Sequence, residues 1–551
     1  MNTIITKLNE YRDSNCRWFF PENQSEISAK DFCYRIDRAV VRLNKLGIKQ
    51  GDRVGLLLDN SLDYAVLLYA VWVTRAIAVP LHQKTPQSTD YGVYLEFFHQ
   101  ACEFSLLFFD DPQLQAPLQN WGAVSGVQVC GTCSLEQSDT PVEQPLRLET
   151  NYPDDLTCFL QFSSGSTGLP KAVEVTHKMI MAQAEAMVGN HNKHVRGVTE
   201  TAGLEMANWL PFSHNLGLFA GIIYPVFVRA NNTIVSLRFY QSSPTAWFKL
   251  LSEKKIEANF STNSILAMSL RPLANLEASD LDLSSLQLYL GGEKVSPLVV
   301  QRTEETLARF NFKPQQIHLG YGLSENTLSA TSSKTGRIET HYFLYGEDRK
   351  IKPVSDKTPR ATALCSIGEA NHNCTITIRD ENEKILPDLN LGEIHIEGPC
   401  VMNRYYRNPA QTDQVLKGNR LKTSDLGFAY NGEFFYHSRK DDLVIVGGRN
   451  FVPDDIELTV ESLEFVSPGC SVVIMVEDEK TGLNKPLLMY EPVHEPTELE
   501  RKEQRKEIQK MVYSKFNLLV NSVITLPAGG IEKTSTGKKK RKVIKAKYLS
   551  I

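Results

Sequence analysis

The sequence predicts an α/β protein with a large N-terminal domain of α/β subdomains, residues 1–438, and a small α+β domain, residues 443–551. Two observations lead to this fold class. Helical periodicity alternates with apolar, β-rich runs as far as about residue 438, which is typical of a body built on parallel sheet. Beyond residue 442, a short helix, a hairpin and an amphipathic helix follow one another. We therefore expect two domains that join near residues 439–442.

The first clear element is a helix over residues 28–47. Ser28 can cap its first turn, with Asp31 reaching back, and Gly47 can end it. Its buried face is predicted from four apolar residues at helical spacing: Phe32, Ile36, Val40 and Leu43. A buried strand at residues 52–60 follows, so that helix and strand alternate from the start of the chain.

The later elements carry the domain division. Residues 344–363 are polar and contain prolines, which predicts an irregular insertion or loop in the large domain. Residues 453–463 begin with proline and acidic residues, a typical helix start. A hairpin is expected around Thr481-Gly482, and an amphipathic helix over residues 501–519. The apolar side of that helix is predicted to contain Ile508, Met511, Val512, Phe516 and Leu519.

Composition argues against several classes of protein. The chain has 551 residues and a formal net charge of -4, with 42% hydrophobic and 23% charged residues, as in a soluble globular protein. Most of the protein would therefore not contribute to binding the phosphate backbone of a nucleic acid. The N-terminus lacks a secretory signal core, and the apolar residues 64–81 are broken by Arg75 and Pro80, so we expect no membrane span. Scattered cysteines predict reduced thiols in the cytoplasm, with Cys130 and Cys133 as a weak candidate zinc or redox pair.

The most informative run is residues 160–177, where an apolar strand end leads into a loop of glycine and hydroxyl residues. Glycines let backbone N–H groups turn toward an anion, and hydroxyls with a lysine add donors for phosphate oxygens. Pro170 stands where a Walker A motif needs its second glycine, so the loop is of another kind. A flexible linker is the alternative, but a buried strand and a Pro-Lys pair flank this run. The predicted phosphate-binding residues are Ser163, Ser164, Gly165, Ser166, Thr167, Gly168 and Lys171.

This loop and five later motifs resemble the adenylate-forming superfamily, which contains acyl-CoA synthetases, peptide-synthetase adenylation domains and firefly luciferase. In chain order the motifs read SSGSTGLPKAV, LPFSHNLG, YGLSE, TSDLG, SRKDDLVIVGGRNFVPDDIE and EKTSTGKKKR. Six matches in the family's order are far more specific than any one of them. Ala172, Ser424 and Glu532 depart from the usual residues, and all three changes are small or tolerable at a surface.

The resemblance implies roles motif by motif. Lys538 would enter the active site and stabilise the charge that develops on the carboxylate oxygen and α-phosphate. His214 would line the carboxylate pocket, and Glu325 would hold Mg²⁺ together with phosphate oxygens of ATP. The resemblance also implies that the small domain is mobile about a hinge at residues 439–442, with Asp441 as the hinge residue. The implied nucleotide contacts are Ser324 on the α-phosphate, Tyr321 on the adenine, Asp425 and Arg439 on the ribose, and Gly292 and Gly322.

Lys538 begins a basic run, residues 538–542, that also suits a nuclear-import signal or a nucleic-acid patch. Five other motifs require a lysine at this place, which favours the catalytic interpretation. Lys539, Lys540 and Lys542 are then either solvated or available to an acidic partner.

Residues 208–227 are similar to the fatty acyl-AMP ligase branch of the family. That branch implies transfer of the acyl group to the phosphopantetheine thiol of an acyl carrier protein. It also implies an extra segment in the large domain that hinders the use of CoA, and residues 337–360 lie where we expect that segment. Residues 257–268 depart from the branch's glycine-rich pattern and are expected to line the acyl pocket. Asn215 stands where this branch commonly has Asp.

Four alternatives remain open at this point. An acyl-CoA ligase of the same fold would use free CoA. An amino-acid adenylation domain would normally hold the α-amine with an Asp near the histidine motif, where this chain has Asn215. A luciferase-type enzyme would consume oxygen. A non-enzymatic nuclear protein would bind DNA in a salt-sensitive way through the basic run.

Overall fold

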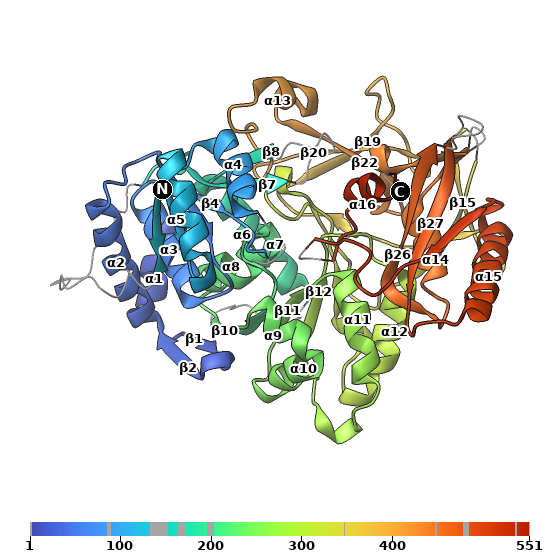
Figure 1. Cartoon of the computed structure of the whole chain (residues 1–551), viewed down its shortest axis with the longest axis horizontal. Helices are drawn as coiled ribbons and strands as arrows, with labels where there is room; N and C mark the ends of the chain where they lie inside the picture. Colours follow the sequence, from blue (N-terminus) through green and yellow to red (C-terminus); the bar gives the residue numbers. More distant parts are fainter. Residues whose placement is uncertain are drawn as a thin grey trace.

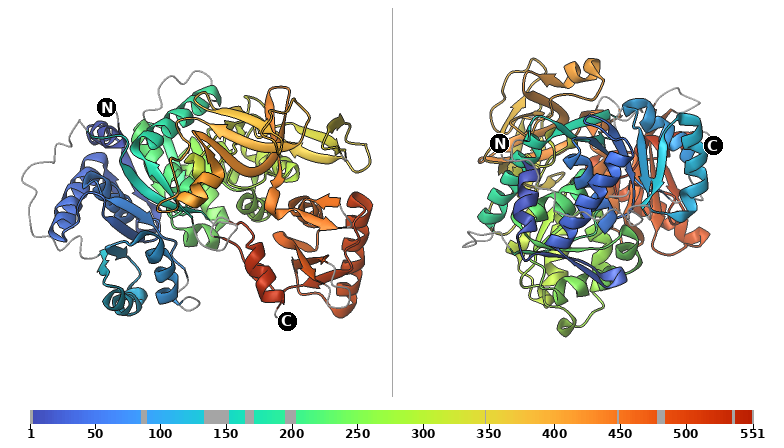
Figure 2. Two further views of the ribbon diagram at one scale, coloured as in Figure 1. Left: turned by 90° about the horizontal axis from the view of Figure 1, so that it is seen from above. Right: turned by 90° about the vertical axis from the view of Figure 1, so that its left-hand side faces the viewer.

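The computed structural model describes residues 3–84, 90–132, 152–163, 171–194, 203–346, 348–446, 449–477, 484–534 and 537–549. Two mainly parallel sheets, an antiparallel β region and a C-terminal part lie next to one another (Figure 1). Seen from above in Figure 2, the C-terminal part stands beside the body, and its last helix, α16 (Arg541–Leu549), lies on the side that faces the N-terminal sheets.

The first sheet confirms the predicted alternation. Its six strands are β3 (Arg53–Leu57), β4 (Ile77–Pro80), β5 (Leu106–Phe109), β6 (Gln128–Gly131), β7 (Thr157–Ser163) and β8 (Lys171–Thr176). Their spatial order is β6-β5-β3-β4-β7-β8, and all neighbours are parallel except β7 and β8. Parallel strands need crossover connections, and the intervening helices supply them.

The second sheet positions the cavity described below. Its strands are β1 (Arg17–Phe20), β2 (Ser25–Ser28), β9 (Glu205–Asn208), β10 (Asn231–Ile234), β11 (Ala258–Ser261), β12 (Gln287–Leu290) and β13 (Ile317–Leu319). Their order is β13-β12-β11-β9-β10-β1-β2, with only β1 and β2 antiparallel. The loops after β11, β12 and β13 therefore meet at one edge, because parallel strands share their carboxyl ends.

Helix α2 (Ala29–Lys45) confirms the first predicted helix. The Ser28 hydroxyl accepts a hydrogen bond from the Asp31 N–H at 3.1 Å, and the four predicted apolar residues are buried. The other helices of the body are α1 (Ile4–Arg12), α3 (Leu62–Val73), α4 (Tyr91–Cys102), α5 (Gln115–Ser125), α6 (His177–His194), α7 (Asn215–Leu218), α8 (Tyr224–Val228), α9 (Leu237–Ser242), α10 (Pro244–Glu253), α11 (Asn263–Leu273), α12 (Pro297–Leu307) and α13 (Pro409–Val415).

The alternation of helix and strand ends earlier than predicted. From Thr331 onward the body is mainly antiparallel sheet, formed by β14 (Thr331–Ser332), β15 (Thr340–Tyr345), β16 (Ile351–Val354), β17 (Thr362–Cys365), β18 (Glu369–Ala370), β19 (Thr375–Arg379), β20 (Gly392–Glu397), β21 (Leu416–Lys417), β22 (Arg420–Tyr430) and β23 (Glu433–Arg439). The long strand β22 pairs with β20 on one side and with β23 on the other. Short loops suffice here, since antiparallel neighbours need no crossover.

The irregular insertion expected at residues 344–363 is the clearest error. Strands β15, β16 and β17 form an antiparallel sheet there, in the order β16-β15-β17. It packs on a small core formed by Phe343, Ile351, Leu364, Phe428 and Phe435. Each strand is short and buries only one or two of these side chains, so its local pattern looks polar even though distant residues complete the core.

The C-terminal part has cores of its own. Its elements are β24 (Val444–Val446), β25 (Arg449–Phe451), α14 (Pro453–Val460), β26 (Val466–Glu477), β27 (Asn484–Pro492), α15 (Glu498–Phe516), β28 (Ser522–Thr525) and α16. The antiparallel pair β26 and β27 confirms the predicted hairpin, whose turn lies outside the described residues. Helix α15 buries Ile508 and Val512 as expected, but Leu519 follows the helix end and is 65% exposed, so its assignment to the apolar side was wrong.

Two further sequence-based expectations concern membranes and thiols. None of the helices in the described ranges has both the length and the apolarity that crossing a bilayer requires. Cys130 is a free cysteine, and its proposed partner Cys133 lies outside the described residues.

Candidate active site

A cavity of about 1750 Å³ lies where the carboxyl ends of β11, β12 and β13 approach β22, β23 and the C-terminal part. Most of the predicted site residues come together on its walls, namely Lys171, His214, Gly292, Tyr321, Gly322, Ser324, Glu325, Asp425, Arg439 and Lys538. Ser163 ends β7, and its side chain is outside the described atoms, as is that of Asp441. The loop residues Ser164, Gly165, Ser166, Thr167 and Gly168 lie outside the described residues.

One wall of the cavity is an acid–base cluster around Asp425. The antiparallel register of β22 and β23 places Asp425 opposite Arg439, whose Nε lies 3.3 Å from a carboxylate oxygen. The Tyr321 hydroxyl donates to the other oxygen at 2.6 Å. Burial raises the pKa of Asp425, and Arg439 and Tyr321 oppose that rise. A buried carboxylate held in this way can accept hydrogen bonds from hydroxyl groups of a ligand.

Glu325 lies on the next wall and is held by a residue that the motifs did not indicate. The Tyr405 hydroxyl donates to Glu325 Oε1 at 2.8 Å, and the Lys171 ammonium lies 5.3 Å from the centre of the Tyr405 ring. Tyr405 therefore connects the predicted metal ligand to the predicted phosphate-binding lysine. It follows β20 in a stretch without a catalytic pattern, so only the folded chain shows its role.

His214 and Lys538 both line the cavity. His214 Nδ1 accepts a hydrogen bond from the Leu216 N–H at 3.3 Å, which leaves Nε2 to carry the proton of the neutral ring. Burial, the Lys538 charge and His82 together lower the pKa of His214 to about 3. Burial raises the pKa of Asp425 and of Glu293, and the nearby Lys538 charge opposes both rises. The Lys538 ammonium is thus close both to His214, on the carboxylate side of the predicted site, and to Asp425, on its ribose side.

His82 is a second histidine that the motifs missed. It follows the carboxyl end of β4, and its Nδ1 lies 3.4 Å from the Ser213 hydroxyl, next to His214. Burial lowers the pKa of His82 to about 4, assisted by Lys84 and Lys540. Its place at the end of a parallel strand was the signal available in the sequence, because ligands bind at such ends.

Comparison with known proteins decides the family. The sequence profile of the family described as AMP-binding enzyme matches residues 9–406, most of the chain. The chain belongs to this family. The resemblance predicted from the six motifs is therefore confirmed, and with it the adenylate-forming class of enzyme.

Relatives and solved structures extend this match over almost the whole AMP-binding enzyme. This chain is 26% identical over 547 residues to the 4-hydroxyphenylalkanoate adenylyltransferase of Mycobacterium tuberculosis. The alignment covers 93% of this chain and 85% of the relative. The chain is 27% identical over 530 residues to a long-chain-fatty-acid–AMP ligase of Mycobacterium bovis, covering 91% and 88%. A structure from a study of fatty acyl-adenylate ligases of E. coli and L. pneumophila superposes with a TM-score of 0.88 at 22% identity, covering 100% and 98%. The McyG A-PCP structure with phenylalanyl-adenylate gives 0.85 at 24% identity, covering 100% and 95%. These superpositions confirm the predicted fold class.

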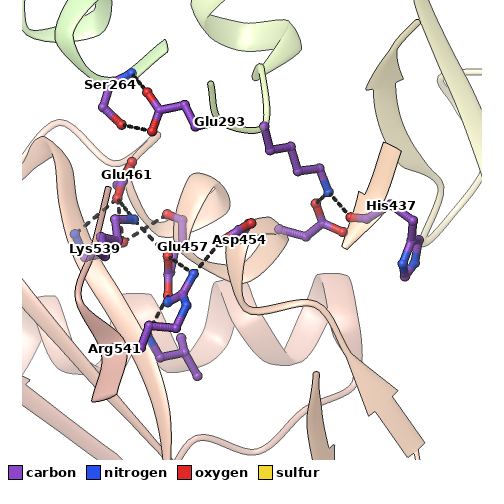
Figure 3. A network of polar contacts seen from close by, with 12 residues as sticks. Ser264, Glu293, His437, Asp454, Glu457, Glu461, Lys539 and Arg541 are labelled. Carbon is purple, nitrogen blue, oxygen red and sulfur yellow. Dashed lines mark hydrogen bonds and ion pairs between the residues drawn. The ribbon is translucent and has the colours of Figure 1, made fainter. Parts of the chain in front are cut away.

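The loop of this AMP-binding enzyme that carries Lys538 is anchored by buried ion pairs (Figure 3). Lys539 Nζ lies 2.8 Å from both Glu457 and Glu461, and Arg541 pairs with Glu457 and Asp454. The charges of Glu457 and Glu461 raise the pKa of Lys539 against the opposing effect of burial. Of the two explanations left open for Lys539, solvation is therefore wrong, and the acidic partner belongs to the same chain.

Lys294 connects the loop after β12 with the C-terminal part. Its Nζ donates to the His437 carbonyl at 3.0 Å and to Asp455 Oδ1 at 2.6 Å. The neighbouring Glu293 accepts from the Ser264 N–H at 2.5 Å and from its hydroxyl at 2.9 Å. Lys294 was not predicted, although it follows Gly292 by only two residues.

Proposed function

We propose that this protein is a fatty acyl-AMP ligase. A carboxylate oxygen of the acid attacks the α-phosphorus of ATP, the bond to the bridging oxygen breaks, and pyrophosphate leaves with that electron pair. The acyl-adenylate then meets the phosphopantetheine thiol of an acyl carrier protein, which forms a thioester and releases AMP. The observation that carries this proposal is the convergence of Lys538, His214 and Asp425 on the walls of one cavity.

The proposed roles follow from what each side chain can donate or accept. Lys538 stabilises the negative charge shared by the attacking carboxylate and the α-phosphate, and neutral His214 donates from Nε2 to the substrate carboxylate. Asp425 accepts hydrogen bonds from the ribose hydroxyls, supported by Arg439, and Tyr321 packs on the adenine. The remaining nucleotide contacts in this proposal are Ser163, Ser164, Gly165, Ser166, Thr167, Gly168, Lys171, Gly292, Gly322 and Ser324.

Mg²⁺ is the metal that fits the donors present. It prefers oxygen ligands and is commonly bound by one or two carboxylates together with substrate phosphates. In the described part of the chain, no group of three His, Cys, Asp or Glu side chains could hold a metal alone. Glu325 would therefore share Mg²⁺ with oxygens of bound ATP. The ion would neutralise phosphate charge.

We also propose that residues 1–438 and 443–551 are two domains with a hinge at 439–442. In support, the buried apolar clusters of the described residues separate along the same line. Three clusters contain only residues up to Tyr436, and two contain only residues from Val444 onward. A body that shares no apolar core with its neighbour can rotate as a unit.

The sheet of β15, β16 and β17 favours a carrier protein over free CoA as the acceptor of the acyl group. Tyr345 of β15 packs edge-on to His437 at 4.7 Å, immediately before the proposed hinge, and the nearby Asp455 helps burial to raise the pKa of Tyr345. This sheet thus lies against the segment that would have to rotate. The Mycobacterium bovis relative is named a long-chain-fatty-acid–AMP ligase, which agrees with a fatty acid as substrate.

The test is carboxylate-dependent pyrophosphate release from ATP with short to long fatty, hydroxy, aryl and amino acids. We expect release with one class of acid, followed by acyl transfer to a holo acyl carrier protein and little transfer to CoA. Efficient thioester formation with CoA would instead identify an acyl-CoA ligase. Absence of pyrophosphate release with every acid would contradict the adenylation itself.

A further inference from the structure

Three rings form a row across the second sheet, on the face that borders the cavity. Phe260 of β11, Tyr289 of β12 and His318 of β13 are register partners on neighbouring strands. The ring centres of Phe260 and Tyr289 are 4.9 Å apart, and those of Tyr289 and His318 are 4.8 Å apart. Phe260 and Tyr289 are only partly buried although the strand residues next to them are buried, because both face the cavity.

Helices α6 and α8 provide the opposite wall and pack against each other. From α6, the His191 ring is hydrogen-bonded through Nδ1 to the Tyr289 hydroxyl at 2.9 Å. From α8, Tyr224 lies near enough to Tyr289 to help burial raise the pKa of the Tyr289 hydroxyl. We call the space between these walls the tail compartment, and define it by the cavity-lining residues Met187, His191, Tyr224, Ala258, Phe260 and Tyr289.

The tail compartment lies deeper in the protein than the nucleotide side of the cavity. Tyr321 and Gly292 lie beyond the carboxyl ends of β13 and β12, whereas Tyr289 lies within β12. Ala258 lies at the start of β11, two residues before Phe260 and on the same face of the strand. A ligand that reaches from His214 past Tyr289 toward Ala258 would therefore enter the tail compartment, whose lining includes Tyr224.

The Tyr224 hydroxyl is a buried polar group of this compartment. The side chain is 2% exposed, and its hydroxyl has no hydrogen-bond partner among the described residues. Other buried tyrosines of the same core are paired: Tyr64 donates to the Phe212 carbonyl at 3.2 Å, and Tyr240 shares a hydrogen bond with Ser269 at 2.5 Å. A buried hydroxyl without a partner is costly, so its retention at a cavity wall points to a partner that arrives with the ligand.

We propose that the tail compartment binds an acyl tail that carries a hydroxyl group, with the Tyr224 hydroxyl as its hydrogen-bonding partner. This inference rests on the proposed acyl-AMP ligase function and specifies its substrate class. An unsubstituted alkyl tail would cover the Tyr224 hydroxyl without bonding to it. A site built around a buried polar group discriminates strongly against the analogue that lacks the complementary group. The hydroxyl could be on an aromatic ring, packed against Phe260 and Tyr289, or at the end of a short alkyl chain.

Matched pairs of acids test the proposal with the full chain. The kcat/KM for pyrophosphate release is measured for phenylpropanoate and its para-hydroxy derivative, and for octanoate and its omega-hydroxy derivative. We expect the hydroxylated member of at least one pair to be preferred by at least about tenfold. The pair that shows the preference tells whether the tail is aromatic or aliphatic.

The variant Tyr224→Phe removes only the hydroxyl. We expect it to lower the ratio of kcat/KM values, hydroxylated over unsubstituted, by about tenfold or more. Tyr240→Phe is the matched control, because Tyr240 is also buried but is not among the described residues that line the cavity, so the ratio should stay as in the wild type. The wild-type ratios test the proposal even if Tyr224→Phe does not fold.

The outcomes separate this inference from the proposed function. Pyrophosphate release with no preference for hydroxylated acids would overturn the inference and leave acyl-AMP formation in place. If Tyr224→Phe does not reduce the preference for hydroxylated acids, the inference is also overturned. The hydrogen-bonding partner of Tyr224 would then be a water molecule and not the hydroxyl group of the acid. Failure of every acid to release pyrophosphate would overturn both.

Discussion

Lys294 and Asp455 join the body of the protein to its C-terminal part through an ion pair of 2.6 Å between Nζ and Oδ1. Their side chains are 7% and 15% exposed, so water screens this pair less than it screens an ordinary surface pair. Lys294 belongs to the loop that also carries Gly292, and Asp455 lies in the first turn of α14. The pair therefore holds the C-terminal part in the arrangement in which Lys538 reaches the cavity.

Lys294→Met should slow adenylation by about tenfold without unfolding the protein, because one buried partner of an ion pair is lost. Asp455→Asn should have a similar effect, and the double variant should be little worse than either single one. A double-mutant cycle on the rate of pyrophosphate release measures this coupling, expected at about 1–2 kcal/mol. Lys334→Met is the control, since the Lys334 side chain is 44% exposed where it pairs with Glu369 and Glu433. Additive effects of the two changes would contradict the coupling.

Lys538→Ala should lower the rate of adenylation by at least about a hundredfold, because it removes the charge that the proposed transition state needs. The fold should persist, since Lys539 and Arg541 anchor the loop through their own ion pairs. Pyrophosphate release and the thermal unfolding midpoint measure the two effects separately. Lys545→Ala, in α16, is the matched control. Near-normal adenylation by Lys538→Ala would refute the role assigned to this lysine.

Local sequence was sufficient where a structural feature depends on local chemistry. The cap at Ser28, the parallel sheets and the convergence of His214, Asp425 and Lys538 followed from residue patterns and motifs. The partners of charged residues could not be predicted in this way. Solvation stayed open as an explanation for Lys539 because its partners, Glu457 and Glu461, are far away in the sequence.

Short strands were the other limit of prediction from sequence. The sheet of β15, β16 and β17 was taken for a loop because each strand buries so few side chains that no period can be recognised. Tertiary neighbours, Phe428 and Phe435, complete its core. The assignment of Leu519 to the apolar side was wrong for the opposite reason, since the helical period was extended past the actual end of α15.

Glu325→Gln should raise the Mg²⁺ concentration that gives half-maximal adenylation by about tenfold or more, because it removes the proposed ligand charge. Tyr405→Phe should produce a smaller shift in the same direction, since Tyr405 orients Glu325 through a hydrogen bond of 2.8 Å. Pyrophosphate release at saturating ATP, titrated with Mg²⁺ after treatment with a chelator, measures both. Glu381→Gln is the control, because Glu381 is exposed and pairs with Arg349 away from the cavity. Unchanged Mg²⁺ dependence in Glu325→Gln would remove Glu325 from the metal site.

His177 should make the protein sensitive to acid. Burial lowers its pKa from the usual 6.5 to about 3, so between these values the unfolded chain binds one more proton than the folded chain. The stabilisation from this residue is complete above pH 6.5 and is lost as the pH falls toward 3. Its loss at pH 5 should be about 2 kcal/mol, at 1.4 kcal/mol for each pH unit.

His177→Phe tests this expectation, because it keeps a ring beside Trp72 and Tyr152 but cannot be protonated. Between pH 6.5 and 5, the free energy of unfolding should fall less steeply with pH for the variant than for the wild type. The difference between the two slopes should correspond to one bound proton. Urea unfolding at a series of pH values measures the slope. Equal slopes for the variant and the wild type would show that His177 is not buried in its neutral form.

Asp441→Pro should spare the first half-reaction and block the second. The substitution acts on the backbone, because proline locks φ near -65° and limits the residue before it. Residues 440–442 form a single 3₁₀ turn between β23 and β24, directly after Arg439, so the arrangement that brings Lys538 to the cavity can persist. Transfer requires the proposed rotation about this turn, and a fixed φ opposes it. Single-turnover pyrophosphate release should stay within about threefold of the wild type, while loading of a holo carrier protein should fall by at least about a hundredfold. Asp441→Ala, which leaves the backbone free to rotate, should retain both half-reactions. If Asp441→Pro also retains both, rotation at residues 439–442 is not required for transfer and the hinge must lie elsewhere.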